Sequence, residues 1–140
     1  MKEEQARQKA LELVERSPIA LVGSNAGDGY PWIKAMLKME TETLRTVWFS
    51  TNTSSRRVTQ FRADPRACVY FVDFSDWMGL MLLGEIEVLD DPQSRQRLWR
   101  DGYERYYPLG VNDPDYSVLR FTAHTANYYH QLDNLSFEPV

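Results

Sequence analysis

The sequence has one cysteine, two histidines and no long apolar run. Cys68 has no partner for an internal disulfide, and its apolar neighbours indicate a small buried side chain rather than a reactive thiol. His124 and His130 lack acidic or thiol residues at ligand spacing, so neither a zinc site nor a catalytic triad is indicated. Asp113 and Asp115 flank a proline in a turn, where aspartate serves local hydrogen bonding. We expect no metal site and no disulfide.

Membrane and export signals are also missing. No segment reaches the length of a membrane span, and residues 1–18 are charged throughout, without the apolar core of a signal peptide. We therefore expect a cytoplasmic protein that makes no contact with a membrane.

Positive charge is scarce, because 16 Lys and Arg residues stand against 20 Asp and Glu residues, a net charge of -4. The overall charge of such a chain does not attract nucleic acid, so any anion site must be local. No predicted strand leads into a glycine-rich dinucleotide loop, which disfavours a Rossmann fold. The length of 140 residues and the 43% hydrophobic content predict one ordered domain over residues 1–140.

Hydrophobic periodicity predicts a mainly β protein with flanking helices. Helical spacing covers residues 3–16, a short segment before Pro65, and a longer segment from Asp91 to Tyr106. Strand patterns cover residues 19–24, 30–39, 46–51, 67–74, 79–89 and 117–129. The apolar content of residues 67–74 and 79–89 predicts that both faces are covered, and Gly84 indicates a bulge or a close backbone approach. Hairpin-like connections predict an antiparallel sheet curled into a small barrel.

Residues 50–61, STNTSSRRVTQF, combine a hydroxyl-rich turn with two adjacent arginines. If Thr53 or Ser54 caps the following helix, the free N–H groups of its first turn lie beside Ser55, Arg56 and Arg57. Together with a bidentate guanidinium, this arrangement suits a phosphate group. The alternative is an ordinary solvated helix start. Cations there oppose the helix dipole, however, and an anionic ligand would remove that small penalty.

The same stretch resembles the flavin-binding split barrels related to pyridoxamine 5'-phosphate oxidase. In that family a strand ending in aromatic-x-Thr-Asn leads to Ser-Arg-Lys, and these residues bind the phosphate of FMN. Here FSTNTSSRRVTQF has the strand residues, the serine and the first arginine in register, with Arg57 at the lysine position. The resemblance implies an antiparallel split β-barrel and FMN contacts from Lys34, Ala35, Met36, Phe49, Ser50, Thr51, Ser55, Arg56, Arg57 and Trp77.

Residues outside that stretch extend the resemblance. Lys34 falls where the family places an arginine on the strand beneath the flavin, and Ala35 and Met36 would lie along the isoalloxazine edge. Lys38 is a displaced counterpart of the family's strand lysine. Trp77, in SDWMG, resembles a segment that reaches the flavin of the partner subunit. The resemblance thus implies a homodimer with the flavin at the interface.

The chain is most similar to the general stress protein branch of that family, which implies an FMN-binding flavoprotein and makes FMN-dependent oxidoreductase activity the leading hypothesis. Gly79 replaces a glutamine of the full oxidases, and the C-terminal Arg-x-x-Pro-like ending that binds the vitamin is missing, so vitamin oxidation is not expected. Related barrels accept FAD, haem or a deazaflavin, which leaves these cofactors open. A flavin carrier or sensor without turnover is the main alternative. Docking of nucleic acid or a phosphorylated partner is disfavoured by the acidic charge.

Overall fold

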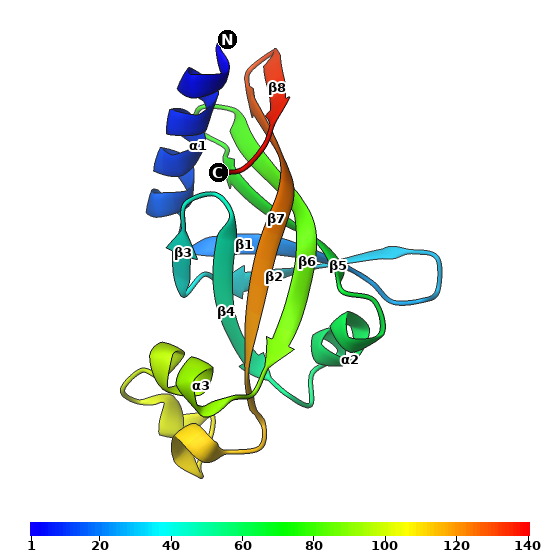
Figure 1. Ribbon diagram of the computed structural model, residues 1–140, viewed down its shortest axis with the longest axis vertical. Helices are drawn as coiled ribbons and strands as arrows, with labels where there is room; N and C mark the ends of the chain where they lie inside the picture. Colours follow the sequence, from blue (N-terminus) through cyan, green and yellow to red (C-terminus); the bar gives the residue numbers. More distant parts are fainter.

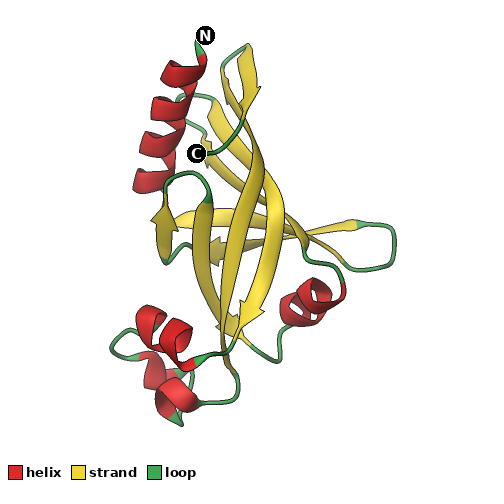
Figure 2. Ribbon diagram, in the orientation of Figure 1, coloured by secondary structure: helices red, strands yellow, loops and turns green.

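The computed structural model describes residues 1–140 as one curved antiparallel sheet with helices at its ends (Figures 1 and 2). The sheet order is β2-β1-β5-β6-β7-β4-β3, and β8 pairs with β7. The sheet curls into a split barrel, as the sequence predicts. The elements are α1 (Glu3–Arg16), β1 (Ile19–Asn25), β2 (Pro31–Leu37), β3 (Glu40–Glu42), β4 (Thr46–Asn52), α2 (Arg56–Ala63), β5 (Arg66–Asp73), β6 (Met78–Leu89), α3 (Pro92–Leu98), β7 (Tyr116–His130) and β8 (Asp133–Phe137).

The main core lies between α1 and the concave face of the sheet. Helix α1 buries one apolar stripe, which matches its 3.6-residue periodicity. Lys38, which follows β2, donates hydrogen bonds to the carbonyl oxygens of Val14 and Glu15 in the last turn of α1. This lysine therefore stabilises the end of α1 and does not face a ligand site. The largest fully buried side chains of the core include Phe49, Phe71, Leu80, Leu82, Phe121 and Tyr128.

A second apolar cluster joins residues 90–116 to the outer side of β4 and β7. Its buried members are Trp48, Leu98, Tyr107, Tyr116 and Val118. Trp99 packs edge-on against Tyr116, with ring centroids 5.2 Å apart. The predicted helix from Asp91 to Tyr106 is therefore wrong beyond Leu98. Trp99 adopts an extended backbone and turns into the cluster, and Gly102 has a φ of 91°, which an α-helix does not allow.

Both predictions for Gly84, a bulge and a close backbone approach, are confirmed. A register shift between Leu83 and Gly84 marks a bulge in the β6–β7 ladder. A Cβ atom at residue 84 would lie 1.9 Å from the carbonyl oxygen of Thr122, so only glycine fits. Strands β3 and β8 were not predicted. Strand β8 places Phe137 beside α1, where the Arg7 guanidinium lies 4.8 Å from its ring centroid.

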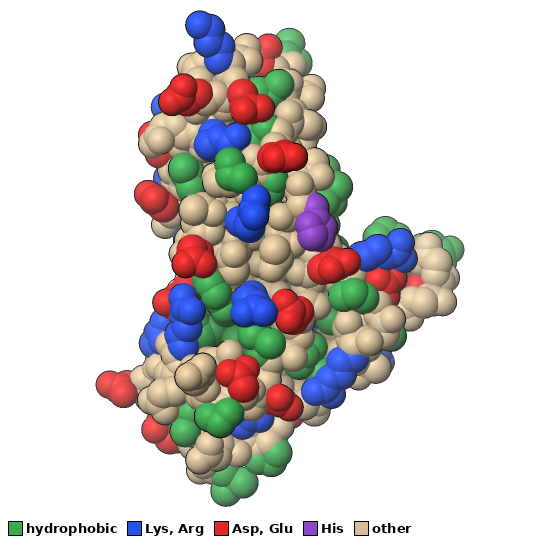
Figure 3. All heavy atoms as spheres, in the orientation of Figure 1, with side chains coloured by type: hydrophobic (Ala, Val, Ile, Leu, Met, Phe, Trp, Pro, Cys, Tyr) green, Lys and Arg blue, Asp and Glu red, His purple; other side chains and the backbone are tan.

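The convex face of β1, β2, β5 and β6 is apolar and open to solvent in the single chain. The prediction that both faces of β5 and β6 are covered is wrong here, because burial alternates along both strands. Ile33 is 69% exposed, Leu37 54% and Leu83 42%. On the face drawn in Figure 3, Lys and Arg side chains are interspersed with Asp and Glu. None of the helices is long and apolar enough to cross a membrane.

Candidate functional site

A cavity of about 280 Å³ lies between the β1–β2 hairpin and the start of α2. Three cations, Lys34, Arg56 and Arg57, line it without any carboxylate. None of the three forms an ion pair with another residue of the chain. In a chain of net charge -4, these are uncompensated positive charges gathered at one place. The other lining residues are Val22, Ser24, Trp32, Ile33, Ser55 and Gln60.

The β1–β2 hairpin extends away from the sheet and forms one wall of the cavity (Figure 1). Strand alternation places Trp32 and Lys34 on the same face of β2. In the hairpin turn, Asp28 accepts hydrogen bonds from the backbone N–H of Tyr30 at 2.9 Å and from Trp32 Nε1 at 3.0 Å. These two bonds lower the pKa of Asp28. The fixed indole ring lies 5.7 Å from the Arg56 guanidinium carbon.

The N-terminus of α2 forms the opposite wall and contains unsatisfied polar atoms. The N-cap is Ser55, not Thr53 or Ser54 as predicted, and no side chain caps the helix. Ser55 Oγ and Arg57 Nε are both buried without a hydrogen-bond partner. Buried polar atoms are rarely left unpaired. Arg95 Nε is also unpartnered, so what distinguishes Ser55 Oγ and Arg57 Nε is their shared position in a cationic cavity, where both can bond a ligand.

Arg57 is held in place from the neighbouring strand. One of its terminal nitrogens donates a hydrogen bond to Thr51 Oγ1 at 3.0 Å. Burial lowers the pKa of the Arg57 guanidinium, which reflects the cost of keeping a cation out of water. An anion in the cavity would offset that cost.

The structure brings together only part of the predicted site. Lys34, Ser55, Arg56 and Arg57 share the cavity, and Thr51 joins them through its bond to Arg57. The remaining predicted residues do not line this cavity: Ala35 is exposed on the opposite face of β2, Met36 and Phe49 are buried in the main core, and Ser50 is half-buried on β4.

Trp77 also lies apart from the cavity, in the turn between β5 and β6. It is 62% exposed and has a φ of 50°, which is strained for a tryptophan. Its carbonyl oxygen accepts a hydrogen bond from the backbone N–H of Gln131. Within one chain, the turn between β5 and β6 lies near α1 and at the other end of the sheet from α2 (Figure 1).

Five of the nine lining residues are absent from the predicted contacts: Val22, Ser24, Trp32, Ile33 and Gln60. Trp32 alternates with Lys34 on one strand face, and that pattern could have identified it. Gln60 follows Arg56 by one helical turn, so its side chain points to the same side of α2. Ser24 Oγ donates a hydrogen bond to Gln60 Oε1 at 2.5 Å and closes the floor between β1 and α2. No local pattern marks Ser24.

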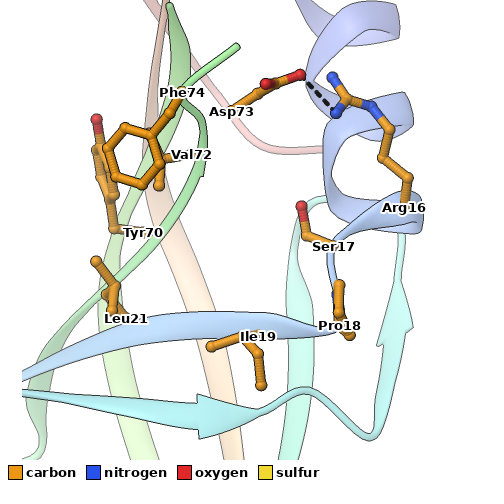
Figure 4. A pocket seen from close by; sticks show the side chains of 9 residues that line it. All are labelled: Arg16, Ser17, Pro18, Ile19, Leu21, Tyr70, Val72, Asp73 and Phe74. Atoms are coloured by element: carbon orange, nitrogen blue, oxygen red, sulfur yellow. Dashed lines mark hydrogen bonds and ion pairs between the residues drawn. The ribbon is translucent and has the colours of Figure 1, made fainter.

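A larger groove, of about 550 Å³, lies between the end of α1 and the convex face of β1 and β5 (Figure 4). Its one cation, Arg16, is paired with Asp73 at 2.8 Å, so no free positive charge remains for an anion. Ile19, Leu21 and Phe74 make much of the lining apolar. This groove is part of the apolar convex face and offers none of the chemistry of the smaller cavity.

Residues 6–130 match the pyridoxamine 5'-phosphate oxidase family. The chain belongs to this family. The crystal structure of a protein from Clostridium acetobutylicum, related to general stress protein 26 of Bacillus subtilis, has 47% sequence identity and a TM-score of 0.88. The match covers 98% of this chain and 96% of that one. No curated protein sequence matches the chain.

More distant structures share the fold. General stress protein 26 from Bacillus anthracis has 16% identity and a TM-score of 0.77, with 94% of this chain and 97% of that one covered. A heme binding protein from Mycobacterium smegmatis has 15% identity and a TM-score of 0.74, with 95% of this chain and 57% of that one covered. These two similarities concern the fold alone.

Proposed function

We propose that the protein binds FMN and acts as an FMN-dependent oxidoreductase. The observation that carries this proposal is the pair of buried, unpartnered atoms Ser55 Oγ and Arg57 Nε in a cavity with three cations and no carboxylate. A phosphate group would accept hydrogen bonds from both atoms and from the free N–H groups of the first turn of α2. The residues present therefore fit the phosphate of FMN.

Each lining side chain has a role that follows from its position. Arg57, fixed by Thr51, would hold the phosphate, and Arg56 would add a second, more exposed charge. Lys34 and Trp32 lie along β2 and would contact the remainder of the ligand, Trp32 through its aromatic face. Bound FMN supplies the hydride or electron transfer, while the chain binds and orients it.

The cavity favours a phosphorylated flavin over haem. Haem iron is held in proteins by His, Cys, Met or Tyr side chains, and none of these lines the cavity. His124 and His130 both lie on β7, outside it. The three cations instead match an anionic group.

We also propose that two copies associate through the convex face of the sheet. Residues paired across β2, β1, β5 and β6 form apolar rows on this face, such as Ile33, Gly23, Cys68 and Leu83. An exposed apolar area of this kind favours a protein interface. A cavity of about 280 Å³ is also smaller than a site that encloses a whole flavin, so a second chain would complete it. The exposed Trp77 is the residue we expect to reach the partner's site.

Size-exclusion chromatography with light scattering tests this association. We expect the parent protein to be a dimer and the double variant Leu37→Glu/Leu83→Glu to be a monomer, because both side chains are already exposed in the single chain. Leu109→Glu is the matched control, since Leu109 is 73% exposed in the segment between α3 and β7, which packs against β4 and β7 and not on this face. A monomeric parent protein would refute the proposed interface.

Flavin binding is tested by titrating the flavin-free protein into FMN, riboflavin, FAD and a deazaflavin while flavin fluorescence is followed. We expect saturable quenching that is strongest for FMN and weaker for riboflavin, which lacks the phosphate. A protein that is purified colourless and leaves FMN fluorescence unchanged is not a flavoprotein.

A flavin carrier or sensor is the second candidate, and one observation favours it. The cavity contains no His, Cys, Asp or Glu, which leaves Lys34 as its one candidate for proton transfer. Steady-state oxidation of NADH or NADPH separates the two functions, because turnover well above that of free FMN identifies an oxidoreductase. Competition of FMN with an oligonucleotide tests the nucleic-acid alternative.

A further inference from the structure

One carboxylate from a distant part of the chain holds the turn that leads into α2. Asp115 Oδ2 accepts a hydrogen bond from Asn52 Nδ2 at 2.9 Å, and Asp115 Oδ1 accepts one from the backbone N–H of Ser54 at 2.8 Å. The backbone carbonyl of Asp115 accepts a third bond, from the N–H of Thr53, at 2.7 Å. Three consecutive residues of the turn are thus fixed by one residue. The side-chain bonds from Asn52 and Ser54 also lower the pKa of Asp115, which therefore stays ionised at neutral pH.

The turn needs this external support because α2 lacks a cap of its own. Ser55 occupies the N-cap position, but its hydroxyl makes no capping bond and stays unpartnered. The only bond within the turn runs from the Ser55 N–H to the Asn52 carbonyl, at 3.0 Å. Thr53 Oγ1 also shares a hydrogen bond with Ser117 Oγ at 2.5 Å, but Asp115 alone bonds the backbone N–H groups of Thr53 and Ser54. The backbone path into Ser55 and the first turn of α2 therefore depends on Asp115, while Thr51 holds the far end of the Arg57 side chain.

Asp115 is itself rigidly placed. Its backbone N–H donates to Asp113 Oδ1 at 2.9 Å, and Asp113 is almost fully buried. Arg95 donates to the Asp113 carbonyl at 3.0 Å, and the Tyr116 hydroxyl donates to the Arg95 carbonyl at 2.8 Å. Tyr116 is fully buried in the aromatic cluster. A continuous series of contacts thus joins that cluster to the turn.

The carboxylate is turned towards the residues of the turn and is not part of the cavity. Each of its oxygens already accepts a bond from the turn, Oδ2 from Asn52 and Oδ1 from Ser54. Asp115 does not line the cavity. Its charge strengthens the bonds to the turn rather than meeting the ligand.

We propose that Asp115 is a positioning residue for phosphate recognition: it fixes the turn over residues 52–55 so that Ser55 and Arg57 present their unpartnered polar atoms to the phosphate of the ligand. This inference rests on the proposed function. It assigns the irregular segment before β7 a part in ligand binding, although no residue of that segment lines the cavity.

The test measures the affinity of the variant Asp115→Asn for FMN and for riboflavin. The amide keeps the shape of the side chain but has one acceptor oxygen fewer, so it loses at least one of the two bonds to the turn. We expect the FMN affinity to fall about tenfold and the riboflavin affinity to change less than twofold. The ratio of the two affinities measures how much the phosphate contributes to binding. A general loss of stability would weaken both ligands equally and leave this ratio unchanged.

Two further variants provide a second test of the turn and a control. Asn52→Ala removes only the bond to Oδ2, from an exposed side chain, and we expect a smaller fall in the same ratio even if Asp115→Asn folds poorly. Asp133→Asn, at the exposed start of β8, is the matched control and leaves the ratio unchanged.

The outcomes separate this inference from the proposed function. A parent protein that prefers FMN to riboflavin, with an unchanged ratio in Asp115→Asn and Asn52→Ala, refutes the role of Asp115 alone. Equal losses of both ligands also refute it, because they indicate a structural role only. A parent protein without any preference for FMN refutes the phosphate site and, with it, the role of Asp115.

Discussion

Replacing Arg56 and Arg57 together by alanine removes both guanidinium groups from the cavity and keeps the helix, because alanine favours helical backbone. A hydrogen bond to a charged group contributes about 1.5–3 kcal/mol. Arg57 belongs at the upper end of that range, since it is half-buried and fixed by Thr51, whereas Arg56 is exposed and belongs at the lower end. The sum of about 4.5 kcal/mol predicts that the double variant binds FMN about a thousandfold more weakly.

The two single variants should divide this loss unequally. We expect Arg57→Ala to weaken FMN about a hundredfold and Arg56→Ala about tenfold. Quenching of flavin fluorescence measures all three affinities, and riboflavin is titrated in parallel. Arg62→Ala is the control, because Arg62 lies in the last turn of the same helix, is exposed and does not line the cavity. FMN binding by the double variant at the affinity of the parent would show that the phosphate site is elsewhere.

Three other perturbations test the structure around the site. Gly84→Ala should lower the melting temperature markedly, since its Cβ would overlap the Thr122 carbonyl oxygen and the backbone would have to shift. Asp73→Asn should destabilise the protein at neutral pH and down to about pH 4. Hydrogen bonds, first from Ser75 and then from Arg16, hold the Asp73 pKa at about 2. Because this folded-state pKa is below the unfolded value of about 3.9, the carboxylate contributes stability above pH 4, and urea titrations should show the difference between variant and parent vanish as the pH falls towards 2. Trp32→Ala should weaken FMN and riboflavin by a similar factor in the fluorescence titration, because the indole would contact the part that both ligands share; a loss confined to FMN would contradict that role.

Local patterns were enough to predict six of the eight strands and the clustering of the charged residues of the candidate site. The strands alternate clearly, and STNTSSRRVTQF keeps its hydroxyls and arginines within one turn and the first residues of a helix, so chain neighbours remain spatial neighbours. The same alternation places Trp32 beside Lys34. These parts of the structure depend on interactions between residues that are close in sequence.

Other features depend on contacts that no local pattern encodes. Asn52 and Asp115 are 63 positions apart, and only the β4–β7 pairing brings them together. The early end of α3 follows from the packing of Trp99 against aromatic rings further along the chain. Tertiary packing overrides helix propensity in such segments. The position of Trp77 also lies beyond local patterns. The predicted homodimer would explain its solvent exposure, because only a second chain could bring this side chain to the cavity.

The cavity gathers features that are unfavourable for the stability of the chain by itself. Lys34, Arg56 and Arg57 repel one another without a counterion, and the buried Ser55 Oγ and Arg57 Nε forgo hydrogen bonds. Each of these features is unfavourable for folding. Nothing in the sheet requires them, because the core, the aromatic cluster and the turn are held by other residues, among them Asp115. Local rules are broken most often where a ligand supplies the missing interaction, so this imbalance is the strongest physical reason to propose an anionic ligand for the cavity.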